Sequence, residues 1–559
     1  MSAASSSSKS KPGGGGLIRS SMIYSALTMV SRIMGFVRDL AVTYAMGASA
    51  TFAADAFNTA FAFPNLFRRI FAEGAFAAAF VPAYSRALEQ DGEEKADVLA
   101  ADAMATLAAA TLAITVIAEL AMPWLMYLIA PGFAANPDKF KLAILLTQIT
   151  MPYLPCMAIY AHLSGVLNAR NRFVLSAAAP ILLNLWTLVV VLPAHTPVGA
   201  AQAASWGVLA AGLSQAALLW WGVTRSGARV DVRWPRLTPE IKALVGRAVP
   251  GALAASASQI NIFISGILVS HVNGGRSWLA VCDRLYLLPV GLVGVAIGVA
   301  LLPRLSRAVH GEDHAGARGA LDQAITFSMA MILPAAFALC VMPFFLIDGL
   351  YTRGAFTNAD ALETAAALRQ YGWGVPAFVL AQLTSRAFFA HQDTRTPMRF
   401  ALVSVAVNIA AGLSLFPVMG VAGIAAATSL AAWVNVLQMV YTLKKRDMYW
   451  PATAAWSRLG RIMLANLALA ALLGAAAVYR PLVEAPFHGI RLGSVLGAKE
   501  IAVALVVIVG GCLYPPLLFM SGGLKLSEIR AALRRQPKAS LDKEIEQDFG
   551  KTPSGPDLL

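Results

Sequence analysis

The sequence predicts an all-α integral membrane protein with about fourteen transmembrane helices. Three observations lead to this fold class. The chain has 559 residues, of which 58% are hydrophobic and only 13% are charged, and its mean hydropathy is +0.64. A soluble protein of this length needs more polar surface. About fourteen apolar stretches rich in Ala, Gly, Leu and Val show no alternating polarity, which favours helices over barrel strands.

The apolar stretches follow one another along most of the chain, and at roughly 20 residues per span there is room for all of them. The N-terminal segment before them, "MSAASSSSKSKPGGGG", is polar and glycine-rich, and no signal-peptide cleavage pattern follows it. The stretches are centred near Met34, Phe71, Leu112, Tyr153, Leu188, Leu209, Ile260, Leu292, Leu333, Gly374, Val407, Ala427, Leu469 and Val507.

Lysine and arginine are concentrated in alternate loops between these stretches. The basic-rich loops include the segments 225–247, 304–318 and 444–461. By the positive-inside rule these loops and both termini are expected on the cytoplasmic side, which requires an even number of spans. This topology accounts for most of the net charge of +14, so no nucleic-acid partner is predicted. The basic-poor loops hold only Lys139, Lys141, Arg276, Arg353, Arg480, Arg491 and Lys499.

The chain also contains an internal repeat. "VPAYSRA" at 81–87 returns as "LPRLSRA" at 302–308, "APGF" at 130–133 as "TRGAF" at 352–356, and "LNARNRF" at 167–173 as "FAHQDTRTP" at 389–397. The three offsets are nearly equal, which predicts two six-helix lobes in the same orientation around a central cavity, plus two C-terminal helices. The predicted divisions are an N-terminal tail 1–20, an N-lobe 21–225, a basic linker 226–243, a C-lobe 244–445, a C-terminal helix pair 446–520 and a C-terminal tail 521–559.

Arginines lie inside several apolar stretches, where each costs roughly 2.5–3.5 kcal/mol on insertion scales. Such residues normally face a protein interior or a water-filled cavity. We place Arg369 and Arg386 near helix ends, where their side chains can reach the membrane surface. The others predict a polar cavity with a positive bias, and the guanidinium fork favours a phosphate-bearing guest. These others are Arg32, Arg38, Arg68, Arg69 and Arg284.

The acidic residues near these arginines are expected to neutralise them unevenly. Arg69 and Glu73 are four residues apart and share a helix face, so we expect a local ion pair. Arg68 is rotated by about 100° from Arg69 and has no such partner. Adjacent side chains on a helix point apart, so the neighbours Arg38 and Asp39 are not expected to pair. The acids available across helices are Asp39, Asp55, Glu73 and Asp283.

No catalytic or metal site is predicted. The histidines lack metal-ligand spacing, and no Walker A or G-x-S-x-G motif occurs. We therefore expect neither an enzyme nor a cofactor, with the membrane potential as the energy source and a coupled ion left open. The four cysteines lie far apart in apolar stretches and are expected to be buried free thiols. They are Cys156, Cys282, Cys340 and Cys512.

Several segments closely resemble the MurJ (MviN) lipid II flippases of the multidrug/oligosaccharidyl-lipid/polysaccharide exporter superfamily. They are "SRIMGFVRD" at 31–39, "DAFNTAFAFPNLFRRIFAEGAF" at 55–76, "CDRLYLLPVGLVGVAIG" at 282–298 and "RAFFAHQDTRTP" at 386–397. The resemblance covers roughly residues 20–520. It implies fourteen helices, two lobes around a cavity, and export of undecaprenyl-pyrophosphate-linked lipid II across the bacterial inner membrane by alternating access. It also implies membrane lipids and the cell-wall synthesis machinery as partners.

The resemblance assigns roles to individual residues. Arginines essential in the family match Arg32, Arg38, Arg68 and Arg284, which would bind the pyrophosphate in the cavity. The last two helices, roughly 458–520, would form a groove for the polyprenyl tail. Where some members carry a carboxylate four residues after Asp283, this chain has Leu287, and a sodium site cannot be mapped. The implied polar or gating residues are Asp55, Asn65, Arg69, Glu73, Ser31 and Ser277.

Four other interpretations remain at this stage. A flippase for another polyprenyl-linked glycan is opposed only by the specific resemblance of "PNLFRRIFAEGAF" to the MurJ family. A drug or metabolite antiporter of the same superfamily would favour an apolar or acidic cavity, which the arginines oppose. A membrane glycosyltransferase would need acidic catalytic groups in sizeable external loops, and the loops here are short. An envelope scaffold without transport would have no reason to keep intramembrane charges.

Overall fold

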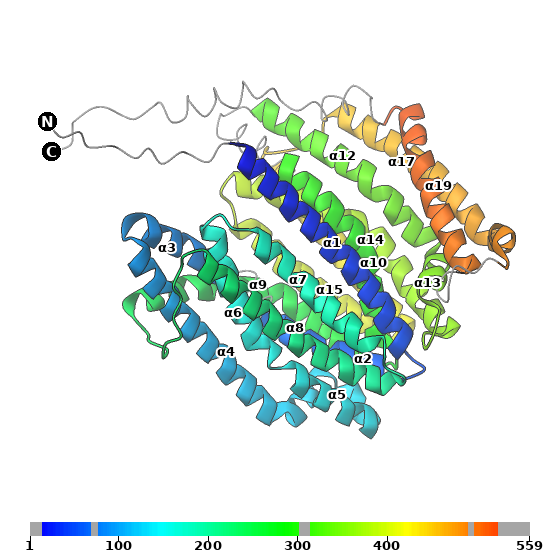
Figure 1. Ribbon diagram of the computed structural model, residues 1–559. Coiled ribbons are helices and arrows are strands. Elements are labelled where there is room, and N and C mark those ends of the chain that lie inside the picture. The colour runs from blue at the N-terminus through cyan, green and yellow to red at the C-terminus, as the bar shows by residue number, and fades with distance from the viewer. Residues whose placement is uncertain (1–13, 69–75, 301–313, 490–496, 524–559) are drawn as a thin grey trace.

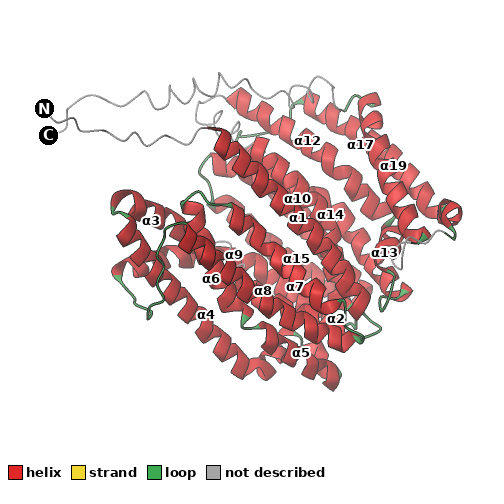
Figure 2. Ribbon diagram, viewed as in Figure 1, coloured by secondary structure: helices red, strands yellow, loops and turns green. Residues whose placement is uncertain are grey.

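A computed structural model describes residues 14–68, 76–300, 314–489 and 497–523 of the chain. These residues form helices joined by short loops and contain no strand (Figure 2). The all-α fold class is therefore confirmed. Arg69 and Glu73 lie outside the described residues, so their predicted ion pair stays a prediction.

The described residues of the first half form eight α-helices and one 3₁₀ helix. Pro64 lies inside α2, where a proline removes a backbone hydrogen bond and favours a bend. The elements are α1 (Gly14–Met46), α2 (Ala53–Arg68), α3 (Phe76–Gln90), α4 (Glu93–Ile129), η2 (Pro131–Ala135), α5 (Pro137–Thr150), α6 (Tyr153–Ala169), α7 (Val174–Val191) and α8 (Pro197–Arg225).

The described residues of the second half form further helices, which include those at the C-terminal end. Its elements are α9 (Pro239–Val269), α10 (Gly275–Ala300), α12 (His314–Val341), α13 (Pro343–Tyr351), α14 (Asn358–Ala390), α15 (Arg395–Met419), α16 (Val421–Lys445), α17 (Thr453–Val478), α18 (Arg480–Glu484), η3 (Ala485–Phe487) and α19 (Ala498–Met520).

Ten helical segments of the described chain are long and apolar enough to cross a membrane. The long helices α1, α9 and α14 are not among them, although each coincides with a predicted apolar stretch. Both α1 and α14 carry charged residues, such as Arg38 and Asp39 in α1 and Glu363 and Arg369 in α14. The total of fourteen spans stays a prediction.

The spacing that relates Val81 to Leu302, which we call the repeat offset, reappears in the helix boundaries. Helices α7 and α15 begin at Val174 and Arg395, which are separated by this offset. It also separates Asn171 and Gln392, which both adopt a left-handed backbone conformation with φ of 58°. Such residues end helices, here α6 and α14. The two halves thus share their chain path in detail.

Two sets of helices pack on either side of α1. Figure 1 shows α3, α4, α5 and α6 on one side and α12, α17 and α19 on the other. Large buried side chains such as Met122 and Tyr153 fill the first half, whereas Tyr351 and Phe388 lie in the core of the second. Ile241 of α9 is buried against the first half. Helix α9 therefore contacts both halves, because its other end packs against α15.

The loops gather at two opposite ends of the bundle, as the charge pattern predicts. At one end Arg170 contacts Asp97 at 3.3 Å, and Arg446 contacts Asp393 at 2.7 Å. These belong to the basic-rich loops. The basic-poor loops meet at the other end and make contacts with one another there. Their basic residues at that end include Lys139, Arg276, Arg353, Arg480 and Lys499.

Two expectations from the sequence are wrong. Cys156 and Cys282 are buried, but Cys340 is half-buried and Cys512 is exposed on α19. An apolar sequence around a cysteine therefore does not imply burial in the protein, because lipid can cover a membrane helix. Arg369 lies about three turns into α14 rather than near a helix end.

Candidate functional site

A cavity lies between the two halves, lined by residues of α1, α2, α7, α8, α10 and α13. Its empty volume is about 690 Å³, part of which is open to solvent. Apolar walls come from Phe57, Phe61 and Tyr351. The polar lining residues are Arg38, Asp39, Thr43, Asn58, Thr187, Ser277 and Arg284.

Asp39 joins two of the predicted arginines inside this cavity. Its Oδ1 accepts hydrogen bonds from Arg38 Nη2 at 2.7 Å and Nε at 3.1 Å. Its Oδ2 lies 2.5 Å from Nε of Arg284. The expectation that Arg38 and Asp39 point apart is wrong, because the long arginine side chain folds back around its neighbour. The contact with Arg284 crosses from α1 to α10 and therefore links the two repeats.

The three side chains form what we call the Arg38–Asp39–Arg284 cluster. Two guanidinium groups face one carboxylate, which leaves the cluster net positive when all are ionised. Arg38 is 8% exposed, whereas the side chain of Arg284 is 50% exposed. Arg284 therefore retains guanidinium surface that an anion entering the cavity could contact.

Arg32 lies on α1 outside the lining of this cavity. Its guanidinium rests against Gly291 of α10, where an added Cβ would lie 2.8 Å from Arg32 Nη1. The glycine thus makes room for the guanidinium. Arg68 is the last residue of α2, and its side chain falls outside the described ones. The structure therefore brings Arg38 and Arg284 together and places Arg32 beside α10.

The remaining predicted polar residues have separate surroundings. Ser31 accepts a hydrogen bond at its backbone carbonyl from Nδ2 of Asn184 at 3.0 Å, which ties α1 to α7. Asn65 is half-buried on α2. Ser277 is buried at the start of α10, and its hydroxyl accepts a hydrogen bond from Nδ2 of Asn58 at 3.3 Å.

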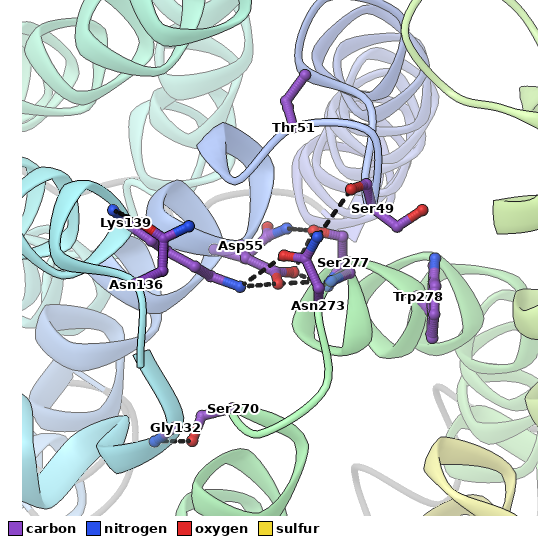
Figure 3. A network of polar contacts seen from close by, with 12 residues as sticks. Ser49, Thr51, Asp55, Gly132, Asn136, Lys139, Ser270, Asn273, Ser277 and Trp278 are labelled. Carbon is purple, nitrogen blue, oxygen red and sulfur yellow. Dashed lines mark hydrogen bonds and ion pairs between the residues drawn. The ribbon is translucent and has the colours of Figure 1, made fainter. Parts of the chain in front are cut away.

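Asp55 closes the cavity towards the basic-poor end (Figure 3). It is fully buried and pairs with Nζ of Lys139 at 2.7 Å. It also accepts hydrogen bonds from the backbone N–H groups of Gly274 at 2.8 Å and Ser277 at 3.0 Å, and from the Ser277 hydroxyl at 2.8 Å. A carboxylate at the N-terminus of α10 is stabilised by the helix dipole. Asp55 therefore fastens α2 of the first half to α10 of the second.

Asp360 makes the equivalent connection from the other repeat. It is fully buried and accepts hydrogen bonds from Ser49 N at 2.8 Å and Trp278 Nε1 at 3.0 Å. A capping box with Thr357 fixes it in the first turn of α14. Asp360 stands one repeat offset after Lys139, so the two residues occupy equivalent positions in the repeats.

Close backbone approaches complete this closed end. We call the contacts of Asp55, Lys139, Asp360, Ser49, Gly47 and Gly132 at this end the interlobe seal. Gly132 N donates to Ser270 Oγ at 3.1 Å, and a Cβ on Gly132 would lie 2.4 Å from His271 N. Gly47, at φ +71°, similarly approaches the carbonyl oxygen of Ala355. Ser49 and Ser270 are again separated by the repeat offset. Each repeat therefore places one loop against the helix start of the other.

Comparison with known proteins identifies the family. The family model described as lipid II flippase MurJ matches residues 42–487. The chain belongs to the MurJ family. It is 37% identical over 518 residues to the probable lipid II flippase MurJ of Rhizobium meliloti, covering 92% of this chain and 95% of that protein. It is 30% identical to the lipid II flippase MurJ of Burkholderia cenocepacia, covering 82% and 89%.

Solved structures show the same fold. A lipid II flippase MurJ in an inward closed conformation superposes with a TM-score of 0.70 at 23% identity, covering 89% of this chain and 98% of that one. An inward-facing multidrug resistance MATE family transporter gives a TM-score of 0.62 at 14% identity, covering 76% and 98%. The MurJ family and MATE transporters therefore share this architecture.

Several residues of the site in this MurJ family member could not be recognised from the sequence. Asp39 was expected only as a source of charge, and Asn58, Lys139 and Asp360 were not expected in the site. A signal existed for Lys139, because it is one of the few basic residues in the basic-poor loops. Among the described residues, no group of three His, Cys, Asp or Glu side chains is placed to hold a metal ion.

The C-terminal helix pair is fastened to the second half at the basic-poor end. Asp348 of α13 pairs with Arg480 and, at 3.1 Å, with Nζ of Lys499. Arg353 pairs with Glu500 of α19 at 3.2 Å. Burial alone would raise the pKa of Asp348, but hydrogen bonds from Arg480 and Lys499 and the charge of Arg480 outweigh it and lower the pKa. These contacts position α17 and α19 beside α12 and α13.

Proposed function

We propose that this chain translocates lipid II from the cytoplasmic to the periplasmic leaflet of the bacterial inner membrane, for cell-wall synthesis. Family membership and the MurJ relatives support this substrate. The observation that carries the proposal is the Arg38–Asp39–Arg284 cluster, a net-positive group in a cavity between two repeats. A pyrophosphate carries the opposite charge and the oxygen geometry that guanidinium groups bind best.

Asp39 holds the two arginines in place before the substrate arrives. Without it, two cations close together would repel each other and turn towards solvent. A pyrophosphate entering the cavity offers more acceptor oxygens than one carboxylate, so the half-exposed Arg284 can engage it first. These charge-assisted hydrogen bonds offset the cost of removing the phosphates from water. Arg32 and Arg68 are proposed to extend the positive surface.

Release follows from the position of the arginines on different repeats. Arg38 lies on α1 and Arg284 on α10, so movement of one half against the other separates them and loosens their hold on the phosphates. In this structure the interlobe seal closes the basic-poor end, which we assign to the periplasm. The substrate would enter from the cytoplasmic end, and opening of the seal would release it on the other side.

The mechanism needs no bond-breaking step in the substrate, and we propose no enzymatic activity and no cofactor. Because the cytoplasm is electrically negative, outward movement of an anion is favoured by about 2.3 kcal/mol per charge per 100 mV. The membrane potential is therefore the proposed energy source, with an exchanged ion left open. Both termini are proposed to lie in the cytoplasm. Helices α17 and α19 are proposed to hold the polyprenyl tail of the substrate. The cell-wall synthesis machinery is proposed as a downstream partner.

A drug antiporter on the same fold is the second candidate, because MATE transporters share the architecture. Cationic drugs would require an acidic or apolar cavity. The guanidinium groups of Arg38 and Arg284 disfavour such a guest.

Depletion of the protein in cells, followed by measurement of lipid II in each leaflet, tests the proposal. Lipid II should accumulate in the cytoplasmic leaflet, and the wild-type gene should restore export. Arg38→Ala should fail to restore it, whereas the matched control Arg86→Ala should succeed, because Arg86 is exposed at the end of α3. Normal lipid II export in depleted cells would refute the assignment.

A further inference from the structure

The segment between α8 and α9 is held firmly to the bundle at its first end. Arg172 Nη1 donates to the carbonyl oxygen of Arg225 at 3.2 Å, and Arg229 N donates to Oδ2 of Asp97 at 2.8 Å. Val230 is only 6% exposed and packs in the core of the first half. The chain is therefore fixed before it reaches residue 231.

The other end of the segment is also fixed. The Thr238 hydroxyl accepts a hydrogen bond from Ile241 N at 3.3 Å and caps α9. Ile241 and Leu244 are buried against the first half. Residues 231–237, "DVRWPRL", thus project between two anchored ends, and we call them the Trp234 segment.

The Trp234 segment combines large apolar side chains with arginines. Val232 is 81% exposed, Trp234 86% and Leu237 66%. Arg233 and Arg236 flank the Trp–Pro pair. Three exposed apolar residues on an anchored loop would be unfavourable in water. A segment in which apolar residues alternate with arginine is typical of a membrane surface.

The second repeat ends in a comparable way. Trp450 and Pro451 follow the basic residues at the end of α16 and precede α17. Nζ of Lys444 lies 4.2 Å from the centroid of the Trp450 ring, and Trp450 is 44% exposed. Both repeats therefore place a Trp–Pro pair beside basic residues at the basic-rich end of the bundle. This recurrence favours a shared environment for the two loops.

We propose that the Trp234 segment is a membrane-surface contact that inserts Trp234, Val232 and Leu237 into the headgroup layer of anionic lipids. Charge complementarity supports this occupant, because Arg233 and Arg236 would face lipid phosphates while the apolar side chains reach the acyl boundary. Tryptophan suits this depth, since its ring is largely apolar and its N–H needs a polar partner. The contact holds the linker between the repeats at the bilayer surface. It does not depend on which molecule the cavity transports.

Tryptophan quenching on the full-length protein tests this contact. Wild type and Trp234→Phe are reconstituted in vesicles of phosphatidylglycerol or phosphatidylcholine whose acyl chains are brominated near the headgroup. The difference between the two proteins reports the environment of Trp234. Trp206→Phe is the matched control, because Trp206 is 58% exposed on the membrane-spanning helix α8. Its difference signal should be quenched in both lipids.

The contact predicts strong quenching of the Trp234 signal in phosphatidylglycerol and weak quenching in phosphatidylcholine. The double variant Arg233→Gln with Arg236→Gln should lose this lipid preference, and circular dichroism verifies that it remains folded. Equal quenching in both lipids would overturn the recognition of anionic headgroups. A Trp234 signal that bromolipids leave unchanged and aqueous acrylamide quenches in both vesicles would overturn the proposal and point to a soluble protein partner.

Discussion

Lys139→Met removes the counter-ion of Asp55 in the interlobe seal. The Lys139 side chain is 5% exposed, and its Nζ lies 2.7 Å from Asp55 and 3.1 Å from Oδ1 of Asn273. Methionine occupies a similar volume without the charge. In the closed seal Asp55 would then be a buried carboxylate without its lysine, whereas in an open seal water could solvate it. The substitution should therefore shift the molecule towards the open arrangement.

The size of the shift towards the open seal depends on the hydrogen bonds that Asp55 keeps when Lys139 is replaced. Removing one partner of a buried ion pair destabilises the protein by about 3–5 kcal/mol. Asp55 keeps three hydrogen bonds from α10, donated by Gly274 N, Ser277 N and the Ser277 hydroxyl. We therefore expect a shift near the lower limit, about 3 kcal/mol, which corresponds to roughly 150-fold in the equilibrium between closed and open seals.

Thiol labelling from the basic-poor face measures this shift. Ala54 is 3% exposed and lines the cavity, so a membrane-impermeant reagent reaches Ala54→Cys from that face only when the seal opens. Cys340 and Cys512 are replaced by serine to remove accessible thiols. Labelling should accelerate strongly with Lys139→Met.

The control is Lys141→Met, which removes an exposed lysine from the same helix. It should leave the labelling rate unchanged. The double variant Asp55→Asn with Lys139→Met should label more slowly than Lys139→Met alone, because no buried charge remains unpaired. If Lys139→Met labels no faster than Lys141→Met, the ion pair does not hold the seal closed.

Arg284→Ala should abolish transport in complementation while the protein still inserts and elutes as a folded species, and normal growth would contradict its role. Gly291→Val should reduce transport in the same assay, because a Cβ would lie 2.8 Å from Arg32 Nη1 and displace the guanidinium; unchanged activity would remove Arg32 from the site. Arg480→Ala should destabilise the purified protein by about 2 kcal/mol, measured by thermal unfolding. Because the pKa of Asp348 is lowered in the fold, this difference should persist at every pH above about 4 and shrink only below it; a loss already at pH 6 would contradict the pairing.

The fold could be predicted from the sequence because its main signals are local or periodic. Apolar stretches give helices, and the basic residues of alternate loops report which end of the bundle each loop occupies. The repeat was visible because short segments kept a nearly constant spacing, and Val174 and Arg395 begin paired helices at that same repeat offset.

The site could be predicted only in part because its contacts are long-range. Asp55 and Lys139 are 84 residues apart, and Ser49 and Asp360 are 311 residues apart. No helical periodicity links such positions. The prediction that Arg38 and Asp39 point apart was wrong for another reason. Directions of neighbouring Cβ atoms predict that short side chains diverge, but arginine is long enough to turn back, and Arg284 holds the carboxylate from the opposite side.

A reversible lock across the interlobe seal tests the central claim, transport by movement of the two repeats. Ser49→Cys and Asp360→Cys place thiols on two residues that a 2.8 Å hydrogen bond from Ser49 N to Asp360 Oδ1 joins across the repeats. The purified double variant is reconstituted in vesicles with labelled lipid II, and movement of lipid II between leaflets is followed with the disulfide formed and after its reduction. We expect no movement in the oxidised protein and recovery on reduction, whereas oxidation and reduction should leave the rate of each single-cysteine variant unchanged. Movement of lipid II at an unchanged rate in the oxidised double variant would contradict alternating access.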